Sequence, residues 1–135
     1  MLQSQSGLLG LSGGVSNDLR DIQEAADNGN EDCMNALKAY AYGIKKYVGA
    51  YVAAMGGVDA IVFGGGIGRK SSRIRSMALK GLDCFGIKLH EGKNMNPNGG
   101  DDISADDSRV RIYVVDTNEE IIVARKAKAL LEQSL

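Results

Sequence analysis

The chain has 135 residues, of which 44% are hydrophobic and 24% are charged, and its formal net charge is −1. This balance is typical of one globular domain with a core, and it gives no reason to expect nucleic acid or an acidic membrane as a partner. No apolar run is long enough to span a membrane, and two cysteines with one histidine make a Cys/His metal site improbable on composition. We therefore expect a cytoplasmic protein with reduced thiols.

A short helix is predicted after a glycine-rich, apolar start at residues 1–15. Ser16 or Asn17 can cap this helix, and Asp18 lies in its first turn, where a carboxylate is favourable. The helix should end near Asn28-Gly29. From the residue pattern alone, Asp18 is a first-turn acid and Arg20 is a solvated side chain.

The longest predicted helix runs from Asn30 to Met55 and ends at Gly56-Gly57. Its apolar residues recur at spacings of three and four, so they form one stripe. The simpler interpretation is a core helix packed on a sheet, and the alternative is a helix that also meets a second subunit. The stripe consists of Met34, Leu37, Ala41, Ile44, Val48, Tyr51 and Met55.

The centre of the chain is a predicted strand, a glycine turn and a helix. Residues 60–63 are apolar and suggest a strand buried on both faces, and Gly64 to Gly68 form a turn with almost no side chains. Ser71 or Ser72 can cap a helix that extends to Leu82. The glycine spacing fits neither a P-loop nor a dinucleotide fingerprint, so the turn alone leaves ligand binding and a plain turn equally open. The cations on this helix form either a solvated face or a surface that attracts a phosphorylated ligand; they are Arg69, Lys70, Arg73, Arg75 and Lys80.

The remainder should contain a short strand at 86–90, a loop at 91–102 with His90 at the surface beside it, and a second clear strand at 109–115. Thr117 and Glu120 have capping-box spacing at the start of a final helix. Glu119 is then left free to help hold a magnesium ion, although a first-turn acid is the simpler interpretation.

Six motifs in this order resemble the C-terminal part of the acetate kinase family, within the actin-like ATPase superfamily. They cover nearly all of this chain but only about the last third of a family member. The motifs are Ser6-Gly7-Leu8-Leu9-Gly10, Ser16-Asn17-Asp18-Leu19-Arg20, Lys46-Tyr47-Val48-Gly49-Ala50-Tyr51, Val58-Asp59-Ala60-Ile61-Val62-Phe63, Gly65-Gly66-Ile67-Gly68 and Thr117-Asn118-Glu119-Glu120.

The resemblance implies an α/β fold, namely the nucleotide-side lobe of an actin-like (ribonuclease H-like) ATPase, with residues 1–135 as a single partial domain. The implied reaction is the transfer of the γ-phosphoryl group of ATP to acetate, with Mg²⁺, to give ADP and acetyl phosphate. By resemblance, Asp18, Leu19 and Arg20 lie in the nucleotide site, the adenosine rests on residues 65–68, and Glu119 supports the magnesium ion. The family also forms homodimers through this region.

Two departures from the family pattern concern the rim of this site. The family usually has Glu-Asn where this chain has Arg69-Lys70, and it commonly has Thr at the position of Gly64. Two cations in place of an acid and an amide should change the edge of the pocket. Arg69 and Lys70 then either reach the ATP phosphates or face solvent.

The family groups that bind acetate and stabilise the transferring phosphoryl group belong to an N-terminal lobe that this sequence lacks. Because phosphoryl transfer depends on positioning and charge stabilisation, we expect this chain alone to be inactive, with no catalytic residue of its own. The alternatives are a non-catalytic nucleotide-binding or dimerisation module derived from a kinase, and part of a propionate or butyrate kinase. The upstream coding sequence would separate a kinase portion from a free-standing module.

Overall fold

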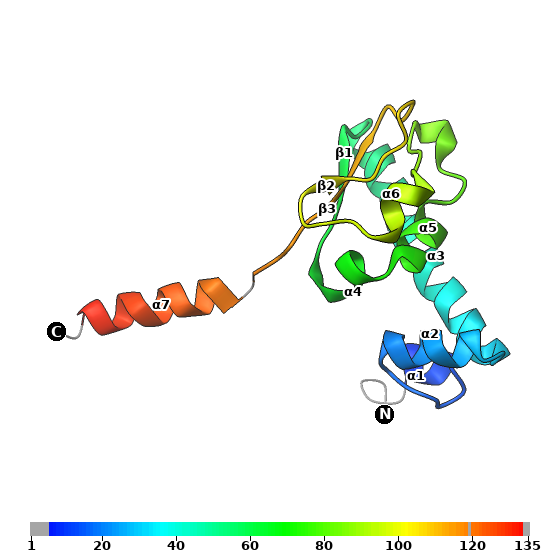
Figure 1. Cartoon of the computed structure of the whole chain (residues 1–135), viewed down its shortest axis with the longest axis horizontal. Helices are drawn as coiled ribbons and strands as arrows, with labels where there is room; N and C mark the ends of the chain where they lie inside the picture. The colour runs from blue at the N-terminus through cyan, green and yellow to red at the C-terminus, as the bar shows by residue number, and fades with distance from the viewer. Residues whose placement is uncertain (1–5, 119, 134–135) are drawn as a thin grey trace.

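The computed structural model describes residues 6–118 and 120–133 and shows a mixed α/β structure with a small sheet and several helices (Figure 1). The mixed α/β class agrees with the prediction. In chain order the elements are α1 (Leu8–Leu11), α2 (Leu19–Asp27), α3 (Glu31–Met55), β1 (Ala60–Phe63), α4 (Gly65–Lys70), α5 (Ser72–Leu79), the 3₁₀ turn η1 (Asp83–Phe85), α6 (Glu91–Met95), β2 (Asp101–Asp102), β3 (Arg111–Val114) and α7 (Glu120–Gln133).

The sheet has the strand order β1-β3-β2, with β1 parallel and β2 antiparallel to β3. The strands predicted at 60–63 and 109–115 are confirmed, as β1 and the centre of β3. The expectation that β1 is buried on both faces is wrong, because Val62 is 57% exposed while Phe63 is buried. The reason is that the second core cluster packs only on the face of β1 that carries Ile61 and Phe63, whereas Val62 points to the other face.

Helices α2 and α3 form the first of two core clusters. The side chain of Asp18, rather than Ser16 or Asn17, caps α2, and it accepts a hydrogen bond from the Arg20 backbone N–H. The Ser16 hydroxyl instead accepts from the Asp18 backbone N–H. The predicted end of α2 is confirmed, and the Asn30 side chain caps α3 by accepting from the Cys33 backbone N–H. The buried residues of this cluster are Leu19, Ile22, Ala26, Cys33, Ala36, Leu37, Ala41, Ile74 and Ala78.

The apolar stripe of α3 is buried only in its first half. Leu37 and Ala41 are buried, whereas Tyr51 and Met55 are exposed, as is Tyr47 beside them. The two tyrosine rings lie with their centroids 6.2 Å apart. The second half of α3 therefore presents a large apolar and aromatic surface. The second core cluster packs against the sheet and comprises Val52, Phe63, Leu79, Leu82, Ile87, Ile103, Val110, Ile112 and Val114.

The glycine segment after β1 is helical, which corrects the predicted turn. Residues 65–70 form α4, and the Ser71 side chain then caps α5 by accepting from the Ile74 backbone N–H, as expected. α5 ends at Leu79 rather than Leu82, and Gly81 with φ 75° follows it. Arg75 is not part of a solvated basic face, because its side chain is buried and hydrogen-bonded.

The region between α5 and β3 is more structured than predicted. Residues 86–90 form only isolated bridges, from Ile87 to Val110 and from Leu89 to Ser104. The predicted loop at 91–102 contains α6 and β2. His90 is exposed as expected, and its Nδ1 atom caps α6 by accepting from the Lys93 backbone N–H. Short elements that depend on local side-chain hydrogen bonds of this kind show little hydrophobic periodicity, so the sequence pattern did not predict them.

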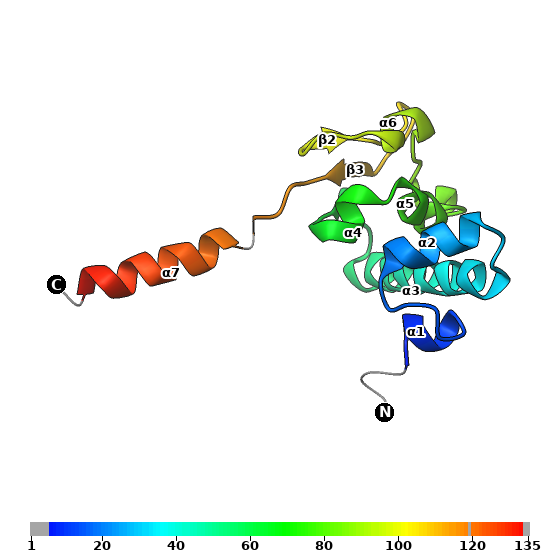
Figure 2. The same cartoon turned by 60° about the horizontal axis from the view of Figure 1, so that its bottom comes forward.

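Helix α7 projects away from the other elements at the end of an extended segment, in both views (Figure 1, Figure 2). The Thr117 hydroxyl, predicted as the cap of the final helix, accepts from the Gly65 backbone N–H, and the Asn118 side chain accepts from the Ile121 backbone N–H. The Glu120 half of the predicted capping box lies outside the described side chains. Within residues 6–118 and 120–133, no helix combines the length and apolar character needed to cross a membrane.

Candidate functional site

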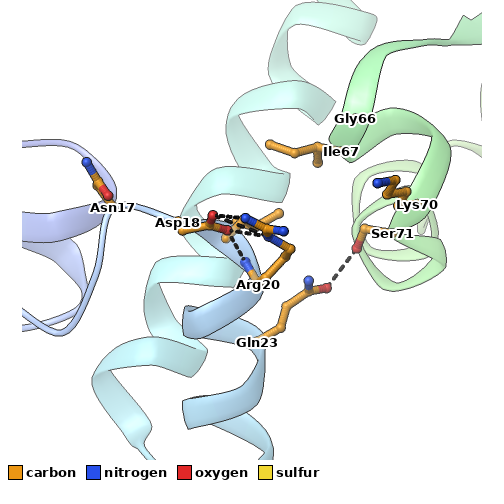
Figure 3. Close-up of a pocket in the computed structure, with 9 residues that line it drawn as sticks. Asn17, Asp18, Arg20, Gln23, Gly66, Ile67, Lys70 and Ser71 are labelled. Carbon is orange, nitrogen blue, oxygen red and sulfur yellow. Dashed lines mark hydrogen bonds and ion pairs between the residues drawn. The ribbon is translucent and has the colours of Figure 1, made fainter.

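A cavity of about 460 Å³ lies between the start of α2 and the segment formed by α4 and the start of α5 (Figure 3). Its two walls come from segments about 50 positions apart in the sequence, and both segments contain motifs that were predicted to contact nucleotide. The lining residues are Asn17, Asp18, Leu19, Arg20 and Gln23 on one wall, and Gly66, Ile67, Lys70 and Ser71 on the other.

Asp18 and Arg20 form an ion pair at the mouth of this cavity. The Arg20 Nη2 atom lies 2.6 Å from Asp18 Oδ2, and Arg20 Nε donates to the same carboxylate. Because the guanidinium of Arg20 hydrogen-bonds to it, the pKa of the Asp18 carboxyl is lowered from 3.8 to about 2. Asp18 is therefore charged at neutral pH, and the Arg20 guanidinium, 82% exposed, retains donors that a ligand can engage.

Leu19 combines a structural and a lining role. Its side chain is buried in the α2–α3 core and also forms part of the cavity wall. It therefore provides an apolar surface held in place by the packing of Ile22 and Leu37 in the same cluster.

Gly66 and Ile67 form the opposite wall. Gly65 has φ 70°, a conformation that favours glycine, whereas a Cβ built on Gly66 meets no atom within 4 Å. Gly66 therefore borders open space, and Ile67 beside it is partly exposed. The part of the wall formed by these two residues is backbone plus one apolar side chain, which suits contact with a flat apolar ring.

Gly65 and Gly68 lie in α4 but do not line this cavity. Together with Gly66 and Ile67 they line a second, more open hollow of about 540 Å³ between α3, β1 and α4. A Cβ on Gly68 would lie 3.4 Å from the Phe63 backbone, so this glycine allows α4 to pack closely on the end of β1.

The two cations after the glycines differ in their placement. Arg69 pairs with Asp116, which follows β3, and it does not line the cavity. Lys70 is exposed and lines the cavity. Of these two cations, therefore, only Lys70 is placed to meet a ligand in the cavity, and Arg69 is not.

Three lining residues were not predicted as site residues, namely Asn17, Gln23 and Ser71. The Ser71 hydroxyl donates to Gln23 Oε1 at 2.7 Å, so one hydrogen bond joins the two walls of the cavity (Figure 3). Ser71 was identified only as a helix cap. The sequence offered two signals of a role in the site. Ser71 lies three residues after Gly68, and Gln23 lies one turn after Arg20.

The predicted metal residue, Glu119, lies outside the described residues. In residues 6–118 and 120–133, no group of three or more His, Cys, Asp or Glu side chains is gathered closely enough to hold a metal ion.

Comparison with known proteins identifies the family of this chain. Residues 1–125 match the model of the acetokinase family. The chain is 46% identical over 132 residues to an acetate kinase of Methanosarcina barkeri, covering 98% of this chain and 32% of that protein. It is 47% identical to an acetate kinase of Thermotoga maritima, of which it covers 34%.

Solved structures give the same result. An acetate kinase of Porphyromonas gingivalis aligns with a TM-score of 0.83 at 43% identity, over 94% of this chain and 32% of that one. A propionate kinase of Francisella tularensis aligns with a TM-score of 0.81 at 34% identity, over 92% and 31%. The chain thus spans about a third of the length of these relatives, and with the family model matching most of its residues it belongs to the acetokinase family.

Proposed function

We propose that this chain is the C-terminal, ATP-binding portion of an acetate kinase and that its α2–α4 cavity holds the nucleotide. The observation that carries the proposal is that the cavity unites the two predicted nucleotide motifs, residues 18–20 and 66–67, across one space. Its volume falls within the range of small-molecule pockets. The homology of the whole chain to acetate kinases supports the same proposal.

In this proposal the lining residues of the two walls make apolar and charged contacts with different parts of the nucleotide. Leu19 and Ile67 contact the faces of the adenine, because both present apolar surface to the cavity. Arg20 supplies polar contacts to the nucleoside, and Asp18 holds the guanidinium in place. Lys70 is the cation that attracts the phosphates from the rim. Arg69 is held by Asp116 and makes no contact with nucleotide.

The parent reaction forms a bond between an acetate oxygen and the γ-phosphorus of ATP and breaks the bond from that phosphorus to the β-bridging oxygen, so ADP leaves. Mg²⁺ would neutralise charge on the phosphates, with Glu119 as the proposed residue that supports it, directly or through water. The acetate or acetyl phosphate contacts would come from an N-terminal lobe that completes this nucleotide-side, actin-like lobe. The chain alone, with no catalytic residue, would then bind nucleotide without transferring phosphate.

Two alternatives rest on separate observations. The alignment to a propionate kinase at 34% identity favours a kinase of a longer carboxylic acid, whose acyl pocket would again lie outside this chain. The exposed surface of α3, with Tyr47, Tyr51 and Met55, favours a dimerisation module, and we propose homodimer contact through it. A cytoplasmic location is part of the same proposal.

Calorimetric titration with MgADP tests the proposal. We expect one saturable site in the wild-type chain and at least tenfold weaker binding in the double variant Asp18→Ala, Arg20→Ala. The matched control is Asp27→Ala, Arg73→Ala, which removes another exposed ion pair, with an N–O distance of 2.6 Å, that joins α2 to α5 outside the cavity.

The control variant should bind MgADP with unchanged affinity. Equal weakening in both variants would mean that the cavity residues have no special role. A folded wild-type chain that gives no binding would contradict the proposal outright.

A further inference from the structure

A buried arginine lies directly behind the α4 wall of the cavity. The Arg75 side chain is 1% exposed and is the largest fully buried side chain in the described residues. Burying a cation costs free energy unless hydrogen bonds replace the water that it loses. Removal from water lowers the pKa of this guanidinium, which nevertheless stays charged because arginine titrates far above neutral pH.

The guanidinium makes four hydrogen bonds to uncharged oxygen acceptors. Nη1 donates to the backbone carbonyls of Gly68, at 2.7 Å, and Arg69, at 2.8 Å. Nε donates to the Asn94 side-chain oxygen at 2.7 Å, and Nη2 donates to the Asn94 backbone carbonyl at 2.6 Å. One side of Arg75 therefore holds the last turn of α4, and the other side holds α6.

Helix α4 needs such support because it is short and rich in glycine. A six-residue helix in which three residues are glycine cannot be stable through its own propensity. The Thr117 hydroxyl accepts the Gly65 N–H at the start of α4, and Arg75 takes two carbonyls at its end. Tertiary contacts thus fix both ends of the wall that contains Gly66 and Ile67.

Asn94 anchors this arrangement to α5. Its side chain is fully buried, and Nδ2 donates to the Ser72 carbonyl and to the Ser76 hydroxyl, both at 3.0 Å. The Ser76 hydroxyl in turn donates to Glu91 of α6. Because each polar group has a partner, the network is rigid, and loss of one member leaves buried groups without a partner.

We infer that Arg75 is a positioning residue of the nucleotide cavity: by clamping the carbonyls of Gly68 and Arg69 to Asn94, it sets where Gly66 and Ile67 stand. This inference rests on the proposed nucleotide function and adds to it the residue that holds the glycine wall. Arg75 does not line the cavity, so it acts through the backbone of α4.

The test is the conservative variant Arg75→Lys, because an ammonium keeps the charge but cannot reproduce the fork of four directed bonds. The matched control is Arg73→Lys, two residues earlier on α5, where the arginine forms the partly exposed pair with Asp27. Amide hydrogen exchange of residues 64–71 measures the clamp, and calorimetry with MgADP measures its consequence.

In Arg75→Lys we expect the α4 amides to exchange about tenfold faster and the Kd for MgADP to rise about tenfold, while amides of α2 and α3 exchange as in the wild type. Arg73→Lys should change neither quantity. Should Arg75→Lys fail to fold, Asn94→Ala removes one of the four acceptors of Arg75, together with the two bonds from Asn94 Nδ2 to α5, and should show the same selective pattern, about threefold in size.

Three results would overturn the inference: exchange that rises evenly across α2, α3 and α4, exchange that does not rise in α4, and faster α4 exchange with unchanged MgADP affinity. If the wild-type chain binds no MgADP, the proposed function fails. The clamp is then judged by exchange alone, where selective loosening of α4 in Arg75→Lys would still support it and unchanged exchange would overturn it.

Discussion

The substitution Gly66→Ala should separate nucleotide binding from folding. Gly66 lies in α4 with an ordinary helical backbone, and a Cβ placed there meets no atom within 4 Å. The added methyl therefore causes no clash in the free chain and raises helix propensity, so the free energy of unfolding should stay equal or rise by up to about 1 kcal/mol. Gly65 would not serve, because its φ of 70° would be strained by alanine.

Bound nucleotide would occupy the open space beside Gly66. Forcing one methyl group into such a contact costs about 1–3 kcal/mol, which corresponds to a Kd for MgADP raised roughly 5- to 150-fold. Calorimetric titration measures the Kd, and thermal unfolding of the same samples measures stability. Gly43→Ala in α3 is the control, because a Cβ there also meets no atom within 4 Å and the site lies outside the cavity.

The control should gain stability without losing affinity. The reasoning would be refuted if Gly66→Ala bound MgADP as tightly as the wild type while remaining folded, since adenosine would then not rest on Gly66.

Three further predictions concern the rim and the caps. Because the Arg20 guanidinium lowers the pKa of Asp18 to about 2, the contribution of Asp18 to stability is complete above pH 3.8 and is lost as pH falls toward 2. The Tm of Asp18→Asn should therefore fall less steeply with decreasing pH than the Tm of the wild type, and an identical fall in both would show that the pair contributes nothing. Ser71→Ala removes the α5 cap and the bond to the opposite wall, and chemical denaturation should report a loss of about 1–2 kcal/mol. A loss below about 0.5 kcal/mol, the range of an ordinary surface substitution, would contradict this. Lys70→Gln should weaken MgADP binding and reduce the salt dependence of that binding. Arg69→Gln should leave the affinity and its salt dependence unchanged, because Asp116 holds Arg69. Equal effects of the two substitutions on MgADP binding would mean that Asp116 does not hold Arg69.

The elements that could be predicted are those set by local chemistry. The Ser71 cap is an example, because its side chain accepts from the backbone N–H of Ile74, three residues later. α4 could not be predicted, because its glycines favour a turn and distant groups stabilise the helix. Those groups are the Thr117 hydroxyl at one end and the Arg75 guanidinium at the other.

The candidate site could be predicted in part. The motif residues Asp18 and Gly66 were identified by resemblance, and the cavity brings them together. Gln23 was not identified: its position one turn after Arg20 indicates only a shared helix face, and its bond to Ser71 depends on how α2 and α5 lie in space. Arg75 was grouped with its neighbouring cations as either a solvated face or a surface for a phosphorylated ligand, because charged residues are mostly exposed, and only its neighbours in space show that it is buried.

The most direct measurement of the central claim is a ¹⁵N-resolved NMR titration of the chain with MgADP, followed residue by residue. The account predicts shift changes concentrated at residues 17–23 and 65–71, the two walls of the cavity, with the region around β2 and residues 103–108 unchanged. Saturable changes that centre elsewhere, or no changes in a folded chain, would contradict the assignment of this cavity to nucleotide.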